Sequence, residues 1–285
     1  MAVEKANEIY CHVPTLLSPV TLPLLGLPVE GLVRLGSAIG YDGLEWRPMR
    51  SVAENQLRMG FVTDYAKRGI KSAEQSYRGE RTWQEASQHP NKRLAQISYI
   101  LFPHRQDSLH SLVRLQSLAG EIPTTVYPTS DPIEAEQQRS LTNKLIQISP
   151  ECMEIFGVTS FEGLIQHMVD NGIGINLDIM HYRRLAQSLQ IPADNVTFRS
   201  ALPYIKEVQF PVARDDFGDP GGDTSNSYED LANGTRNNEN TRLLLTLLER
   251  GYEGPIVPEV NPAAFGTGIL KAHKEIVKGL RSFTT

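Results

Sequence analysis

Polar side chains end four consecutive strand-like runs in the second half of the chain. These residues are Glu151, Asp178, Gln209 and Glu259. Three carboxylates that met at one point would repel one another unless protons or a cation neutralised them. Carboxylate and amide oxygens suit a hard divalent ion such as Mg²⁺ or Mn²⁺. The pattern therefore predicts a metal site, provided that the fold brings these four strand ends together.

The elements that must position these residues are short apolar or β-rich runs alternating with helical patterns. There are eight such runs, at residues 9–13, 43–48, 70–75, 124–128, 145–151, 174–179, 205–210 and 255–260. They are nearly continuous rather than alternating in polarity, as expected for parallel strands covered on both faces. Alternation of strands and helices gives a parallel sheet with right-handed crossovers. Eight units within 285 residues predict an α/β fold, a single-domain (β/α)₈ TIM barrel spanning residues 1–285.

Helix start and stop signals support this alternation. Helices are expected within residues 28–40, 51–69, 107–120, 131–144, 159–172, 238–251 and 268–280. Ser51 with Glu54 forms a capping box, Asp131 precedes Pro132 as an N-cap, and most of the segments end at a glycine. An open doubly wound sheet is the competing fold, but the glycine-rich phosphate turn typical of it does not occur in the sequence.

Residues 212–238 form a polar stretch that is too long for an ordinary turn between a strand and a helix. Long loops in compact domains often act as lids over a site, and the alternative is a solvent-exposed excursion.

In a parallel barrel, active-site side chains project from the C-terminal ends of the strands. The earlier strands also end in polar or aromatic residues, namely Glu45, Trp46 and Arg47, then Glu74 and Gln75, then Tyr127. A single acidic residue at a strand end is often only a helix cap or an ion-pair partner. Pro150 precedes Glu151 and makes the position of Glu151 at the strand end less certain. Gln147 or Ser149 could instead lie at the C-terminal opening of the barrel.

Composition excludes several classes of function. The formal net charge is −5, which disfavours an extended basic surface for nucleic acid. Residues 15–29 are apolar but contain prolines and are too short to span a bilayer, so no membrane association is expected. Two cysteines and a charged N-terminus favour a reducing, cytoplasmic location.

Four segments in order resemble a known family. "GYDGLEWRP" (40–48), "GINLDIMH" (174–181), "IKEVQF" (205–210) and "GYEGPIVPEV" (251–260) resemble the sugar phosphate isomerase/epimerase superfamily, the xylose isomerase-like TIM barrels of the endonuclease IV-like fold group. The resemblance runs from about residue 30 to residue 280. It implies a (β/α)₈ barrel with one divalent ion, Mn²⁺ or Mg²⁺ with Co²⁺ or Zn²⁺ as alternatives, held by Glu151, Asp178, Gln209 and Glu259.

The resemblance also implies an activity. We expect an isomerase or epimerase of a small sugar, keto-polyol or related hydroxy-carbonyl compound, with Glu151 and Glu259 moving the proton next to the carbonyl. The substrate-binding residues are expected to be His181, Arg214, Glu45, Trp46, Gln75 and Tyr127. The partner is a small molecule, and a homodimer is expected by analogy with the family.

Three alternatives remain open. Gln209 is also used by the inosose dehydratase-like branch, which favours a lyase. A degenerate barrel that binds a ligand without catalysis would explain the altered ends of strands three and four. A nuclease with a trinuclear zinc cluster is the weakest reading, because Gln75 and Tyr127 stand in the region where that branch has histidines.

Overall fold

The computed structural model describes residues 6–13, 27–49, 52–75, 105–192, 201–212, 227–260 and 264–284. Among the helices in these ranges, none combines the length and the apolar character needed to cross a membrane.

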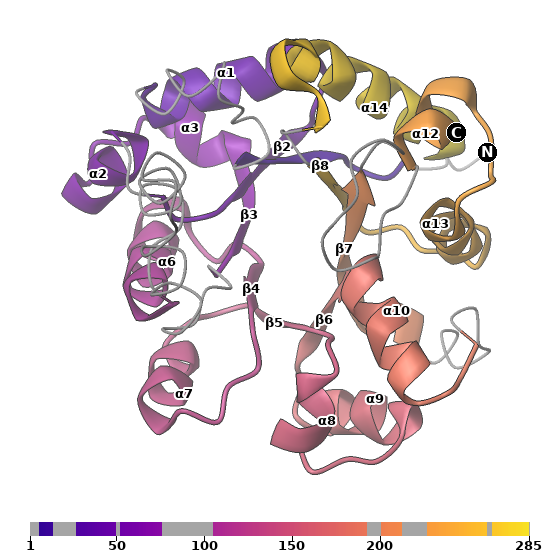
Figure 1. The fold of residues 1–285 in the computed structure, drawn as a ribbon. Helices are drawn as coiled ribbons and strands as arrows, with labels where there is room; N and C mark the ends of the chain where they lie inside the picture. The colour runs from indigo at the N-terminus through magenta and orange to yellow at the C-terminus, as the bar shows by residue number, and fades with distance from the viewer. Residues whose placement is uncertain are drawn as a thin grey trace, which may run out of the picture.

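Eight parallel strands form one sheet in sequence order and close into a barrel (Figure 1). The strands are β1 (Tyr10–His12), β2 (Gly43–Trp46), β3 (Ile70–Glu74), β4 (Thr124–Val126), β5 (Lys144–Gln147), β6 (Gly174–Asp178), β7 (Ile205–Val212) and β8 (Ile256–Val260). A parallel bridge between Ile9 and Ile256 joins the first strand to the last. The predicted (β/α)₈ barrel is confirmed, and every expected strand is present.

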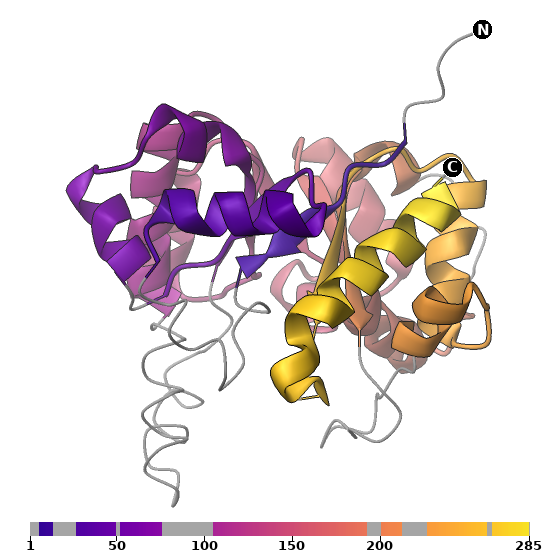
Figure 2. The same cartoon turned by 90° about the horizontal axis from the view of Figure 1, so that it is seen from above.

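The helices form a ring outside the sheet (Figures 1 and 2). They are α1 (Val29–Ile39), α2 (Val52–Met59), α3 (Asp64–Gly69), α6 (Arg105–Ala119), α7 (Pro132–Arg139), α8 (Glu151–Ile155), α9 (Phe161–Asp170), α10 (Ile179–Ser188), α12 (Ser227–Asn233), α13 (Glu239–Glu249) and α14 (Ile269–Thr284). Two short 3₁₀ helices, η3 (Leu202–Tyr204) and η5 (Gly266–Gly268), precede β7 and α14.

Most helix boundaries follow the signals in the sequence. Asp131 caps α7 by accepting from the amides of Ile133 and Glu134, and Gly40 ends α1 with a left-handed φ of 116°. Two predicted helices are wrong in extent. The helix expected within 131–144 ends at Arg139, and β5 already begins at Lys144. Where one helix is expected at 51–69, residues 52–69 form two helices, α2 and α3. Gly60 adopts a left-handed φ of +78° between them, which ends the first helix.

Three helices were not predicted. The short α8 follows Pro150, and α10 begins directly at the end of β6. The third, α12, lies within the stretch predicted as a loop, so residues 212–238 are not one irregular segment. Residues 213–226 of that stretch lie outside the described ranges, and a lid role stays a prediction.

The apolar core is a shell between the sheet and the helices. Leu44 and Trp46 of β2 point outward into this shell, as do Leu177 of β6 and Val208 of β7. Inside the barrel most side chains are polar, where many barrels carry aliphatic layers, although Leu145 of β5 and Val257 of β8 also lie on the inner face. Asn176 donates to the Thr125 hydroxyl at 2.7 Å and to a Glu207 carboxylate oxygen at 2.9 Å.

Packing in the outer shell is tight where α14 meets α12. A Cβ added to Gly279 would lie 2.4 Å from the backbone oxygen of Leu231. Gly279→Ala is therefore expected to lower the free energy of unfolding by about 1–3 kcal/mol through overpacking, as measured by urea unfolding. Gly268→Ala is the control, since nothing lies within 4 Å of its added Cβ. Equal effects in the two variants would contradict this packing argument.

Candidate active site

Each strand contributes one inward polar side chain to the C-terminal mouth of the barrel. In strand order these are His12, Glu45, Glu74, Tyr127, Gln147, Asp178, Gln209 and Glu259. Tyr127 follows the last residue of β4 directly, and the other seven lie within their strands. Side chains alternate between the two faces of a strand, so the residues beside them point toward the helices. We call these eight residues the mouth ring.

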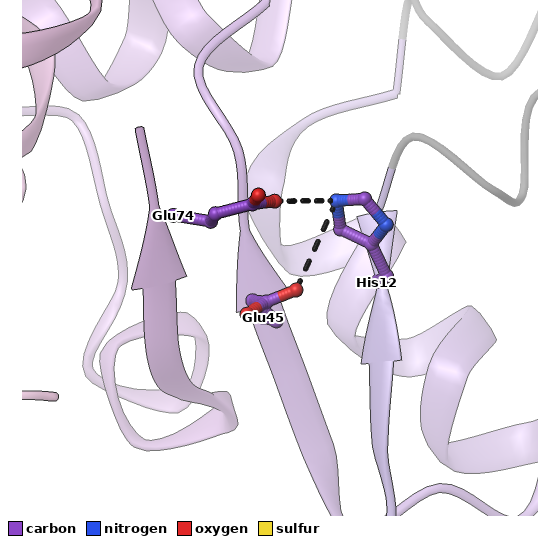
Figure 3. Close-up of side chains that lie close together, drawn as sticks. All are labelled: His12, Glu45 and Glu74. Carbon is purple, nitrogen blue, oxygen red and sulfur yellow. Dashed lines mark ion pairs between the residues drawn. The ribbon is translucent and has the colours of Figure 1, made fainter. Parts of the chain in front are cut away.

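One side of the mouth ring holds a buried histidine between two glutamates (Figure 3). His12 Nε2 lies 3.1 Å from a Glu74 carboxylate oxygen and 3.8 Å from one of Glu45. His12 Nδ1 lies 3.4 Å from a Glu259 oxygen. Ligand atoms of His12, Glu45 and Glu74 all fall within 4.8 Å of one another, a spacing at which this group could bind a metal ion.

Glu74 is fixed as a carboxylate by its neighbours. The Tyr127 hydroxyl donates to one of its oxygens, and Arg47 Nε lies 3.5 Å from the other. Burial alone would raise the pKa of Glu74, but the Arg47 charge and the hydrogen bond and charge of His12 lower it to about 2. Burial lowers the pKa of His12, which favours the neutral imidazole.

The other side of the mouth ring comes from β5 to β8. Gln147 Nε2 donates to Asp178 Oδ2 at 3.0 Å, and Gln209 Nε2 donates to Glu45 Oε1 at 3.2 Å. Burial raises the pKa of Glu259 well above its usual range, and the charges of Asp178 and Glu74 raise it further. Asp178 and Glu259 therefore face a common space in which negative charge accumulates.

Glu207 lies one layer below the mouth ring, beneath Gln209 on β7. Burial, the main cause, raises the pKa of Glu207 to about 7, and the charge of Glu74 adds to this. Burial also raises the pKa of Glu45 well above its usual range, and the charge of Glu207 contributes to that shift.

The raised pKa of Glu207 predicts a pH dependence of stability. Between the ordinary value of 4.5 and about 7, the unfolded chain releases a proton that the folded protein keeps. Stability is therefore expected to fall as the pH rises through this window, in metal-free buffer. Glu207→Gln should make the fall shallower, because a glutamine cannot ionise and its carbonyl still accepts from Asn176. Thermal unfolding across this pH range tests it, and an unchanged slope would contradict it.

Buried oxygens in the mouth ring fit a bound cation. Within the part of the chain that the structure describes, no amide, hydroxyl or guanidinium group donates to Gln147 Oε1, Gln209 Oε1 or Glu45 Oε2. Buried acceptors normally find a donor, and a cation serves acceptors in the same way. The donor set of carboxylates, amide oxygens and one imidazole suits a divalent ion.

The structure separates the predicted site residues into four groups. Glu45, Tyr127, Asp178, Gln209 and Glu259 all belong to the mouth ring. His181, in the first turn of α10, lies beside it, with Nε2 3.8 Å from Asp178 Oδ2. Arg214 lies outside the described residues.

The remaining three predicted residues are not members of the mouth ring. β5 ends at Gln147, so the prediction that this strand reaches Glu151 is wrong. Glu151 instead begins α8 and is exposed. Its roles as ligand and base stay predictions. Trp46 is fully buried on the outer face of β2 and donates to Glu54, which leaves its ring no access to a substrate in the mouth. Gln75 donates to Glu134 of α7.

Sequence reasoning missed His12 as a member of the site and named Gln147 only as an alternative to Glu151. His12 is the last residue of β1, so the strand-end rule applied to the other strands also selects it. On β5, the alternation of side chains places Gln147 on the inner face of the barrel. At Pro150 the chain has already turned into α8, before it reaches Glu151.

Among the comparisons with known proteins, the one with solved structures finds matches, and these agree with the barrel fold. No protein-family model matches the sequence. The curated proteins likewise contain no match. A solved xylose isomerase domain-containing protein from Salmonella typhimurium LT2 matches with a TM-score of 0.50 and 15% identity, over 100% of this chain and 97% of that chain. A sugar phosphate isomerase/epimerase from Parabacteroides distasonis ATCC 8503 matches with a TM-score of 0.50 and 11% identity, over 100% of this chain and 98% of that chain. At these identities the likeness shows the fold alone, and the chain has the fold of the xylose isomerase-like TIM barrels.

Proposed function

We propose that the protein is a metal-dependent isomerase or epimerase of a small sugar, keto-polyol or related hydroxy-carbonyl compound. The observation that carries this proposal is the mouth ring, in which Asp178, Gln209 and Glu259 converge from adjacent strands with unpartnered oxygen at Gln209. The two matched structures described as xylose isomerase or sugar phosphate isomerase/epimerase proteins share the fold that would present such a site.

Asp178, Gln209 and Glu259 would hold a divalent ion, Mn²⁺ or Mg²⁺, together with a ligand from the end of β5 or from the chain that follows it. That ligand is either Gln147, which already contacts Asp178, or the predicted Glu151 beyond it. When bound, the ion polarises a substrate carbonyl and so acidifies the neighbouring C–H bond.

The chain itself supplies the proton acceptor and the orientation. Glu259 is the candidate base, since its side chain is 23% exposed at the mouth and touches His12 on its inner side. Both carboxylate oxygens of Asp178 are held by hydrogen bonds. Oδ1 accepts from the Met180 amide and so caps α10, and Oδ2 accepts from Gln147 Nε2. His181, one turn further on, would contact substrate oxygens.

A lyase of the inosose dehydratase type is the second candidate, because Gln209 rather than a histidine stands on β7. Both reactions begin with proton abstraction next to a carbonyl. They differ in the product, since a dehydratase expels a hydroxyl group and the product loses the mass of one water.

The test is solvent exchange in D₂O with a panel of ketoses, inososes and short hydroxy-ketones, using protein loaded with Mn²⁺. We expect deuterium to enter at the carbon next to the carbonyl for at least one compound, and chelator treatment to abolish this. Mass spectrometry of the product then separates isomerisation from dehydration. Metal-loaded protein that exchanges no compound in the panel would contradict both proposals and favour a non-catalytic barrel.

A further inference from the structure

We propose that His12, Glu45 and Glu74 bind a second divalent cation, on the β1–β3 side of the barrel mouth. This inference builds on the proposed function, which assigns the first cation to Asp178, Gln209 and Glu259 on β6–β8. The three residues are each at most 2% exposed, and their ligand atoms all lie within 4.8 Å of one another. They come from three adjacent strands, as Figure 3 shows.

Glu45 provides the observation that distinguishes a ligand site from a mere acidic cluster. Its Oε1 accepts from Gln209, and its Oε2 is buried with no amide, hydroxyl or guanidinium donor among the described residues. The neighbouring Glu207 carboxyl can share a hydrogen bond with Glu45 only while one of the two is protonated, so the ionised pair leaves this oxygen without a donor. This oxygen lies 3.8 Å from His12 Nε2, so it is directed into the group. A buried carboxylate oxygen without a donor is stabilised by a metal ion placed against it.

His12 has the arrangement of a metal-binding imidazole. Its Nε2 faces Glu74 and Glu45, and its Nδ1 lies 3.4 Å from a Glu259 oxygen. Metal-bound histidines usually donate their second ring nitrogen to a carboxylate, which fixes the tautomer and orients the ring. With the proton on Nδ1 toward Glu259, the Nε2 lone pair points at the two other ligands.

The charge balance of the site is consistent with two cations. Five carboxylates lie in or just below the mouth, the buried ones of Glu45, Glu74, Asp178 and Glu207 and the partly exposed one of Glu259. The guanidinium that contacts them within the described residues is that of Arg47. Fully ionised, the set would carry four more negative than positive charges, and two divalent ions offset that excess, whereas one would offset half of it.

The two sets of ligands adjoin each other across the mouth. Gln209 of the first set donates to Glu45 of the second, and Glu259 of the first set touches His12 of the second. Two ions held in this way would suit a substrate with oxygens on adjacent carbons, which is the pattern of a hydroxy-carbonyl compound. One imidazole and two carboxylates suit Mn²⁺ better than Mg²⁺ at the second site.

The experiment measures Mn²⁺ bound per chain. Full-length protein is stripped with chelator, dialysed against Mn²⁺ and analysed for metal, and its electron paramagnetic resonance spectrum is recorded. The variants are Glu45→Gln for the second site, Asp178→Asn for the first, and Glu54→Gln as a control buried carboxylate outside the mouth. Circular dichroism checks folding, and His12→Asn replaces Glu45→Gln if the latter does not fold.

We expect two Mn²⁺ ions per wild-type chain, with the spectral coupling of a close pair, and one uncoupled ion in each site variant. The Glu54→Gln control should keep both ions. If the wild-type chain binds a single ion that Glu45→Gln retains and Asp178→Asn loses, the second site is overturned and the proposed function stays intact. A single ion with the opposite dependence would support the site on β1–β3 and overturn the ligand set of the proposed function. No bound ion at millimolar Mn²⁺ would overturn both.

Discussion

Glu74→Leu is expected to lower the free energy of unfolding by about 3 kcal/mol, the largest stability effect that we predict for one substitution. The reason is Arg47, whose side chain is only 12% exposed and which loses the carboxylate that lies 3.5 Å from its Nε. Removing one partner of a buried ion pair typically costs about 3–5 kcal/mol. The lower end applies because the charges of Glu259 and Glu45 also act on Arg47.

Urea unfolding of the metal-free protein measures this effect. The matched control is the double variant Arg47→Met with Glu74→Leu, in which both charges are replaced by apolar groups of similar size. Because such replacements are often close to neutral, the double variant should be more stable than Glu74→Leu alone. A single variant that loses less than about 1 kcal/mol would mean that Arg47 is not held by Glu74 in solution.

Glu259→Gln is expected to lower the rate of solvent deuterium exchange into substrate by about 10²–10⁴-fold, since that is the usual contribution of a general base. Folding should survive the change. Burial and the nearby carboxylates raise the pKa of Glu259, so the metal-free protein already favours the neutral form, and an amide has nearly the same shape. Stability at neutral pH should therefore be unchanged or slightly higher.

The two readouts for Glu259→Gln are the exchange rate in Mn²⁺-loaded protein and the thermal unfolding midpoint without metal. Glu249→Gln on α13 is the control, because that side chain is 66% exposed and pairs with Arg236 on the surface. Full exchange activity in Glu259→Gln would remove this residue from the mechanism. Loss of exchange together with unfolding would instead make its role structural.

The barrel could be predicted from sequence because its signals are local. Continuous apolar runs mark strands buried on both faces, and capping residues and glycines such as Asp131 and Gly40 mark where helices begin and end. The failures have local causes as well. Gly60 divides one helical pattern into two helices, and Pro150 starts α8 before the chain reaches Glu151.

The site could be predicted only in part. Asp178, Gln209 and Glu259 follow from the rule that strand ends face the mouth. The strand-end rule alone misplaces Trp46 and Gln75, because their side chains lie on the outer faces of their strands. The alternation of side chains between the two faces excludes them and identifies His12 and Gln147. The contacts of Glu74 with His12 and Tyr127 required the closed barrel, because they join residues far apart in sequence whose distances depend on strand stagger.

The polar interior of the barrel has a consequence for how this protein can change over evolutionary time. Since Thr125, Asn176 and Glu207 fill the space inside the sheet, little of the hydrophobic stabilisation comes from there, and the shell between sheet and helices supplies it. Inward substitutions that leave the pair of Arg47 and Glu74 intact would therefore alter the proposed reaction while leaving the main source of stability in place. Fold maintenance and chemistry are assigned to opposite faces of the same strands, so a new activity could arise here by inward substitutions alone.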